Sequence, residues 1–123
     1  MCFKHKWIGN DIIFSFKGEI SFDEIEEANC EIYGDSRYDQ MNYAIYDFKS
    51  AKCINLTDKE IDVISALDNS ISTWNRNLKL ALIGNDKNSV NERILHYIKL
   101  MENNDWDIEL FDHPGEAIEW CLT

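Results

Sequence analysis

An alternation of apolar and polar side chains runs through residues 3–17 and is interrupted at Gly9, Asn10 and Asp11. A period of two on both sides of a Gly-Asn-Asp turn indicates an antiparallel β-hairpin, because successive side chains of a strand point to opposite faces. We expect the second strand of this hairpin to end at Gly18.

Four later segments carry apolar residues at helical spacing. Three of them open with a capping box, a serine or threonine followed three residues later by glutamate, at Ser21, Thr57 and Ser89. The fourth opens with Pro114, which fits a first helical turn. The stripes predict that these side chains are buried: Phe22, Ile25, Ala28 and Ile32; Ile61, Ile64, Leu67, Ile71 and Trp74; Val90, Ile94, Tyr97, Ile98 and Met101; Ala117, Ile118, Cys121 and Leu122.

Short apolar runs at residues 43–48, 78–83 and 106–111 separate the helices and are interpreted as strands. The order is therefore ββαβαβαβα. Strands that alternate with helices favour parallel pairing through right-handed crossovers. We predict an α/β fold with a single mixed, mostly parallel sheet, an N-terminal antiparallel hairpin and four helices.

The length and composition indicate one domain that spans residues 1–123. One proline and five glycines leave no room for a flexible linker. No apolar run approaches the roughly 20 residues that a membrane helix needs, and the N-terminus has no apolar signal core. We therefore expect a cytoplasmic protein without membrane insertion.

Twelve basic and 23 acidic residues give the chain a net charge of −11. Nucleic acid and anionic membrane repel such a surface, so neither is an expected partner. A basic protein surface is compatible with it, although the charge can also serve solubility alone.

The four cysteines, Cys2, Cys30, Cys53 and Cys121, form no CxxC pair and have no histidine at metal-ligand spacing. We expect reduced thiols and no zinc site.

Four stretches together resemble the STAS domain, the fold of anti-sigma factor antagonists and of the cytoplasmic ends of sulfate transporters. They are FSFKGEISFDEI near the start, YAIYDF in the middle, LKLALIG after the second helix and FDHPGEAIEW at the end. More narrowly, the chain is similar to the diverged SpoIIAA-like group, also labelled STAS/SEC14, whose members are largely uncharacterised. The resemblance covers nearly the whole chain and rests on the serial order of these stretches.

The resemblance implies a regulatory module that binds a protein partner, and a homo-oligomer is compatible with it. In anti-sigma factor antagonists an aspartate at the end of the central strand precedes a phosphorylated serine or threonine. That aspartate corresponds to Asp47, but Phe48 follows it, and Ser50 and Thr57 come later. A phosphorylation switch at the family position is therefore not expected here.

Ligands of open parallel sheets tend to lie beyond the carboxyl ends of the strands. By this rule the edge gathers Asp47, Phe48 and Ser50 from one loop, Gly84, Asn85 and Asp86 from another, and Asp112 and His113 from a third. With Thr57 added, the candidate set for a partner or phospho-switch site comprises Asp47, Phe48, Ser50, Thr57, Asp86, Asp112 and His113. A phosphate on Ser50 would add nearly two negative charges there. The alternative is structural: a strand end, a loop serine and a helix cap at Thr57. A Mg²⁺ site on the carboxylates is disfavoured, because the acidic pair of a receiver domain is missing.

No catalytic motif is present. The serines and cysteines have no GxSxG-type context, and the phosphate-binding patterns GxxxxGK[ST] and GxGxxG are absent. We therefore expect a protein that is not an enzyme and that uses no cofactor or metal.

Aromatic side chains leave a second function open, that of a carrier or sensor of a small hydrophobic, lipid-like ligand. Those that could line a pocket are Tyr43, Tyr46, Phe48, Trp74, Tyr97, Trp106, Phe111 and Trp120. Aromatic residues at core spacing are also ordinary core residues. An exposed Trp74 or Tyr38 could instead mark a dimer contact.

Overall fold

The structure is a computed structural model that describes residues 3–123. The strands are β1 (Phe3–Ile8), β2 (Asp11–Ile20), β3 (Tyr43–Ile54), β4 (Lys79–Ile83) and β5 (Asp107–Phe111). The α-helices are α1 (Phe22–Tyr33), α2 (Asp58–Ile71), α3 (Asn88–Leu100) and α4 (Pro114–Cys121), and short 3₁₀ helices lie at η1 (Ser36–Gln40) and η2 (Ser72–Trp74). Cys30, Cys53 and Cys121 are free thiols, whereas the expectation for Cys2 falls outside the described residues.

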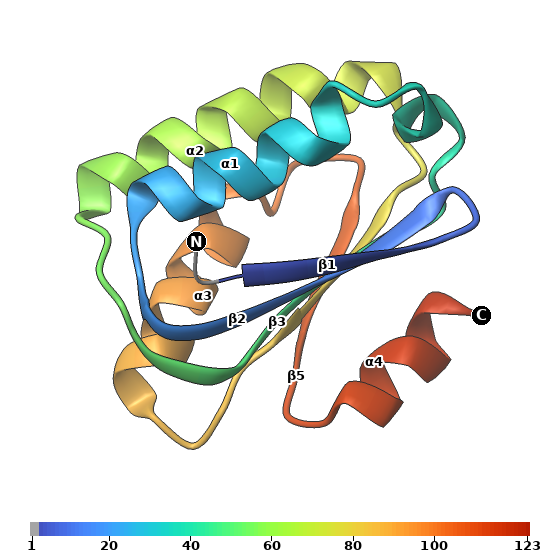
Figure 1. The fold of residues 1–123 in the computed structure, drawn as a ribbon. Helices are drawn as coiled ribbons and strands as arrows, with labels where there is room; N and C mark the ends of the chain where they lie inside the picture. The colour runs from blue at the N-terminus through green and yellow to red at the C-terminus, as the bar shows by residue number, and fades with distance from the viewer. Residues whose placement is uncertain (1–2) are drawn as a thin grey trace.

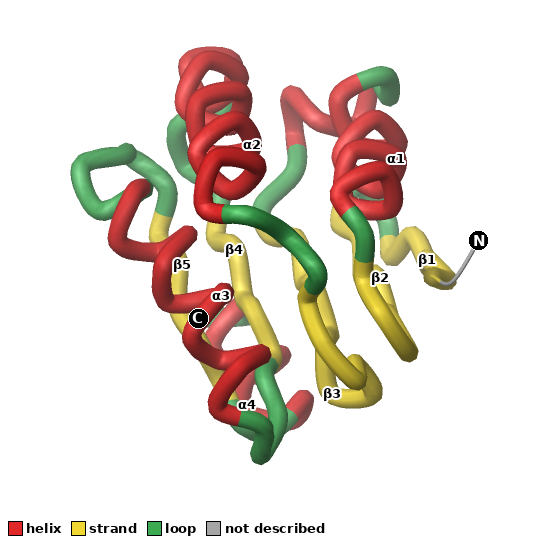
Figure 2. The backbone as a smooth tube through the Cα atoms, turned by 90° about the vertical axis from the view of Figure 1, so that its left-hand side faces the viewer, coloured by secondary structure: helices red, strands yellow, loops and turns green. Residues whose placement is uncertain are grey.

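The five strands form one sheet in the order β1-β2-β3-β4-β5, which Figure 2 shows from one end. β1 is antiparallel to β2, and the other neighbours pair in parallel. The predicted class, a mixed and mostly parallel sheet with an N-terminal hairpin, is confirmed.

The helices form two unequal layers. Each crossover from β2 to β5 moves the chain one strand further in the same direction, so right-handed connections place α1, α2 and α3 on one face of the sheet. α4 follows the last strand and covers the opposite face of β3, β4 and β5 (Figure 1). The opposite face of β1 and β2 has no helix over it among the residues described, and Lys4, Ser15 and Lys17 are exposed there.

Strand alternation sorts the side chains into a large and a small core. Ile12, Phe14 and Phe16 of β2 are fully or almost fully buried and pack with the layer of three helices. The small core, under α4, is built from Tyr43, Ile45, Ala81, Ile83, Ala117 and Cys121. Residues 43–48 are apolar on both faces because, as the sequence suggested, they form a central strand with a core on each side.

Two strands are longer than predicted. β2 continues past Gly18 to Ile20, and β3 continues past Phe48 to Ile54. The two extensions pair with each other in parallel, with irregular register, and Gly18 adopts a positive φ of 73° within the strand. The sequence prediction ended β2 at Gly18 because glycine is a common terminator, whereas here it serves an irregular strand.

Several helix details were also wrong. α3 begins at Asn88 after Lys87, without a side-chain cap, so Ser89 lies inside the first turn and forms no capping box. In α2, Leu67 is 54% exposed, while Asp68 is buried. Trp74, Ile118 and Leu122 are exposed although their stripes predicted burial. Tyr38, which lies within η1, is buried although it was a candidate for an exposed contact.

Candidate functional site

Three parallel strands reach the same level of the sheet at the predicted edge. Asp47 of β3 pairs with Ile83 at the end of β4, and Ile83 pairs with Phe111 at the end of β5. The loops after β4 and β5 therefore start side by side. Beyond this level β3 pairs, among the residues that the structure describes, only with β2, and this extension of β3 borders the edge on one side.

A lysine of the β3 extension contacts the loop after β5. The Asp47 carboxylate accepts a hydrogen bond from the Lys49 backbone N–H at 2.8 Å. The Lys49 ammonium group in turn donates to the backbone oxygen of Asp112 at 2.8 Å. The side chains of Asp86, Asp112 and His113 remain exposed around this contact.

The buried residue Asn85 links the loop after β4 to the β3 extension. Its buried side-chain amide donates to the carbonyl oxygens of Phe48 at 3.3 Å and Ala51 at 2.9 Å, which fixes the β3 extension. Its carboxamide oxygen accepts from the Lys87 N–H, and the Asn91 amide donates to the Asn85 carbonyl at 2.8 Å. The sequence placed Gly84, Asn85 and Asp86 at this edge, but the ability of asparagine to bond distant backbone groups gave no visible signal of this structural role.

The candidate residues divide into a surface group and a structural group. We define the strand-end rim as Asp47, Ser50, Asp86, Asp112 and His113, which lie at this edge with Asp47 half-buried and the others exposed. Phe48 does not belong to a surface, because it is buried and stacks on Phe16 in the core. Thr57 caps α2: its hydroxyl accepts from the Glu60 N–H, and Glu60 accepts from the Thr57 N–H.

Metal binding finds no support at the rim. No group of three or more His, Cys, Asp or Glu side chains within residues 3–123 has the geometry to hold a metal ion. Nor is any helix in that range long and apolar enough to cross a membrane.

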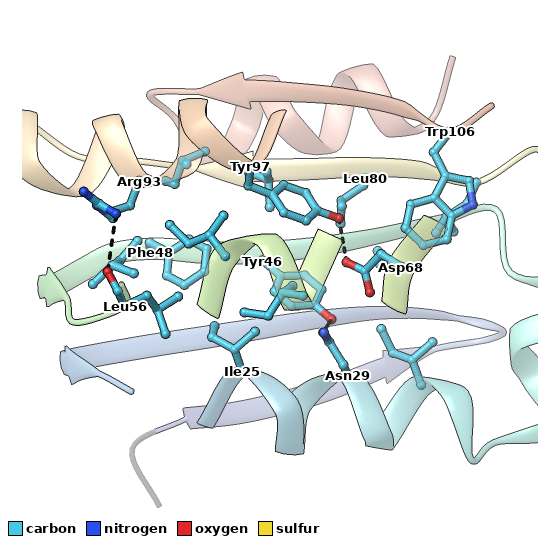
Figure 3. A pocket seen from close by; sticks show the side chains of 18 of the residues that line it. Ile25, Asn29, Tyr46, Phe48, Leu56, Asp68, Leu80, Arg93, Tyr97 and Trp106 are labelled. Atoms are coloured by element: carbon cyan, nitrogen blue, oxygen red, sulfur yellow. Dashed lines mark hydrogen bonds between the residues drawn. The ribbon is translucent and has the colours of Figure 1, made fainter. Parts of the chain in front are cut away.

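A cavity of about 80 Å³ lies between the sheet and the three-helix layer (Figure 3). Its walls are almost entirely apolar, and α1, α2, α3 and the central strands all contribute. Representative lining residues are Ile25, Tyr46, Phe48, Leu80, Ile94 and Trp106. Of the eight aromatic residues considered from the sequence, Tyr46, Phe48, Tyr97 and Trp106 line it, whereas Tyr43, Trp74, Phe111 and Trp120 do not.

One carboxyl group lies in this apolar surrounding. Asp68 of α2 accepts hydrogen bonds from the Tyr33 hydroxyl of α1 and, at 2.7 Å, from the Tyr97 hydroxyl of α3. Burial raises the pKa of Asp68 to about 6, although the two hydroxyl groups oppose the rise by stabilising the carboxylate. Tyr46 bonds to Asn29 nearby, and burial raises the pKa of the Tyr46 hydroxyl well above its usual value.

Sequence reasoning missed Asp68, although a signal existed. Ile61, Ile64, Asp68 and Ile71 follow one helical stripe, and Leu67 lies off its centre. The prediction chose Leu67 because it is apolar. A buried aspartate on a core stripe requires hydrogen-bond donors, and the two tyrosines that supply them are distant in sequence.

Two solved structures share this fold. A protein from Thermotoga maritima, assigned provisionally as an anti-sigma factor antagonist, superposes with a TM-score of 0.65 at 18% identity, covering 98% of this chain and 95% of that one. An uncharacterized DUF3478 family protein with a SpoIIAA-like fold, from Shewanella loihica, gives a TM-score of 0.55 at 13% identity and covers 98% and 92%. No protein-family model and no curated protein sequence matches the chain. The chain thus has a SpoIIAA-like, STAS-type fold, as the resemblance implied.

Proposed function

We propose that this protein is a non-enzymatic regulatory module that binds a protein partner through the strand-end rim. The observation that carries the proposal is the convergence of the loops after β4 and β5 with the β3 extension, tied together by Lys49 and Asn85. A fixed edge of this kind presents side chains in one arrangement, which lowers the entropic cost of binding. The shared fold with a provisional anti-sigma factor antagonist supports a regulatory role.

The chemistry of the rim suggests the kind of partner. Asp47, Asp86 and Asp112 bring three carboxylates to this edge, and the whole chain carries a charge of −11. Such a surface attracts a basic protein surface and accelerates its association. Ser50 is exposed on β3, opposite Lys17 in the register of β2, so a phosphate there would change the charge of the rim directly.

The test compares proteins captured from native cell extract by three forms of this chain. The rim variant carries Asp86→Lys and Asp112→Lys, both on exposed side chains. We expect the wild type to enrich a specific partner and the rim variant to recover it at least about tenfold less, since a like-charge contact replaces an attractive one. Quantitative mass spectrometry of the captured proteins provides the measurement.

The matched control carries Glu27→Lys and Glu31→Lys, which make the same change in net charge on the exposed face of α1. It should capture the partner as the wild type does. Equal recovery by the rim variant, or loss of recovery by the control as well, would show that the rim is not the binding surface.

A second function, the carrying or sensing of a small hydrophobic ligand, is favoured by the cavity around Tyr46. Its apolar walls suit a hydrocarbon group, and Asp68 with its two tyrosines offers a polar anchor.

Native mass spectrometry of gently purified protein tests this second function. Ala44→Val adds volume at the cavity, whereas Ala81→Val makes the same change under α4, away from it. A bound small molecule that the wild type and Ala81→Val retain and Ala44→Val loses would support a carrier. Protein of unmodified mass in every sample would count against it.

A further inference from the structure

Both edges of the sheet are open. β1 pairs only with β2, and β5 pairs only with β4, within the described part of the chain, and Figure 2 shows the two strands at opposite ends of the sheet. An edge strand presents a row of unpaired backbone N–H and C=O groups, to which another extended strand can add. Four of the six side chains of β1 and two of the five of β5 are exposed, and none in either strand is buried.

The two edges carry opposite charges at the same spacing. β1 exposes Lys4 and Lys6, and β5 exposes Asp107 and Glu109. All four side chains point to the α4 side of the sheet. Lys6 pairs with Ile13, which packs against the small core, and Glu109 pairs with Ala81, which belongs to that core.

The opposite side of both strands is mostly apolar, with exposed His5 between Phe3 and Trp7 on β1. Phe3 and Trp7 of β1, and Ile108 and Leu110 of β5, pack only partly against the large core. A groove of about 520 Å³ runs along β5, with Ile98 of α3 on one flank and Trp120 of α4 on the other. The edge of β5 is thus accessible to a strand that has apolar residues on one face and charged residues on the other.

From this complementarity we propose that a second copy of this chain adds its β1 to β5, so that one sheet continues into the next. Because β1 runs opposite to β2–β5, the added strand is antiparallel when the helix layers of both copies lie on the same side. The register that places Lys6 opposite Asp107 also places Lys4 opposite Glu109. The same register places Phe3 opposite Leu110 on the face that α1, α2 and α3 cover.

The backbone groups fit this register. The Asp107 N–H bonds to Leu78, and the Phe111 carbonyl accepts from Gly84, so these residues face β4, and Ile108 and Leu110 face outward. In β1, the two-residue turn makes Ile8 and Asp11 a hydrogen-bonded pair, so the backbone groups of Ile8 face β2. The direction of the backbone groups alternates along the strand, so those of Phe3 and His5 face away from β2. The pairs His5–Ile108 and Phe3–Leu110 can therefore exchange backbone hydrogen bonds.

The same charges disfavour the symmetric alternatives. Pairing of β1 with β1 would bring lysine against lysine, and pairing of β5 with β5 would bring carboxylate against carboxylate. The contact is therefore heterologous and extends copy by copy. A single strand pair is a small interface between copies that each carry a charge of −11, so we expect a dissociation constant on the order of 0.1 mM.

Sedimentation velocity over about 0.01–1 mM protein tests the proposal. The wild type should show a concentration-dependent rise in mean sedimentation coefficient. Lys4→Glu/Lys6→Glu makes both edges acidic, and Asp107→Lys/Glu109→Lys makes both edges basic. Each variant alone should associate about tenfold or more weakly than the wild type, because two attractive pairs become repulsive.

An equimolar mixture of the two variants is the decisive sample. Each acidic edge then meets a basic edge of the other variant, so association should return to at least the wild-type level. Lys52→Glu/Lys59→Glu, exposed positions outside β1, should behave as the wild type, and circular dichroism verifies that each variant is folded. A wild type that stays monomeric at about 1 mM, or a mixture no more associated than its components, would overturn the proposal.

Discussion

At the scale of single residues, Asp68 contributes most to the chemistry of the interior. Its carboxyl group accepts hydrogen bonds from Tyr33 and Tyr97, and thereby connects α2 to both neighbouring helices. Burial of the carboxylate is unfavourable, which is why its pKa rises from 3.8 to about 6. Asp68 therefore releases its proton near its raised pKa of about 6.

Asp68 should make the stability of the protein depend on pH. Because its folded-state pKa is the higher one, the folded protein binds more protons between about pH 4 and about pH 6. The free energy of unfolding should fall by up to roughly 3 kcal/mol as the pH rises through this window. Asp68→Asn, whose amide oxygen still accepts a hydrogen bond, should lack this fall.

Urea denaturation at a series of pH values measures the effect as the difference between variant and wild type. Glu31→Gln, on an exposed residue of α1, should follow the wild type at every pH. Parallel curves for Asp68→Asn and wild type would mean that Asp68 keeps an ordinary pKa.

At the scale of elements, the strand ends are fixed by side-chain bonds to backbone groups. Asn85, after β4, reaches three carbonyl oxygens of β3, those of Phe48, Lys49 and Ala51. β4 ends at Ile83, so within the described part of the chain β3 has no strand partner on that side beyond Asp47. The bonds from Asn85 replace part of the missing backbone hydrogen bonds. The rigidity that we infer for the strand-end rim depends on them.

Asn85→Ala should remove this support. We expect a loss of about 1–3 kcal/mol in the free energy of unfolding, because buried carbonyl groups lose their donor. Hydrogen exchange should become faster in residues 48–54, at the extension of β3. Asn88→Ala, at the exposed start of α3, serves as the control and should leave exchange in that segment unchanged.

Thr57 belongs to the element scale as well, since its hydroxyl caps α2. Thr57→Ala should lower the free energy of unfolding by about 1 kcal/mol, whereas Thr57→Ser, which keeps the hydroxyl, should change it little. Chemical denaturation measures both. If partner capture rather than stability changed in Thr57→Ala, a binding role for this residue would have to be reconsidered.

At the scale of the whole molecule, charge is distributed unevenly. α1 carries Asp23, Glu24, Glu26, Glu27 and Glu31 and no basic residue, whereas β1 carries two lysines and no acid. The total of −11 opposes the compact state through self-repulsion. The edge contact proposed between copies must also overcome repulsion between two chains that each carry this charge.

Salt should therefore stabilise the monomer. Raising the ionic strength from about 0.01 M to about 0.15 M shortens the screening length from roughly 30 Å to roughly 8 Å. We expect the melting temperature, measured at micromolar protein by circular dichroism, to rise over this range. A melting temperature that falls with salt would indicate that local ion pairs, such as Arg93 with Asp58, outweigh the overall repulsion.

The sequence by itself determined the order of elements, the class of the sheet and the edge at which the strands end, because these follow from local periodicity, capping and connection rules. It identified Asp47, Asp86 and Asp112 as members of one edge for the same reason. Only the tertiary structure decided the length of β3, the burial of Phe48 and Asp68, and the role of Asn85. Each of these depends on partners more than 30 residues away, such as Tyr33 for Asp68, and no local pattern records such contacts.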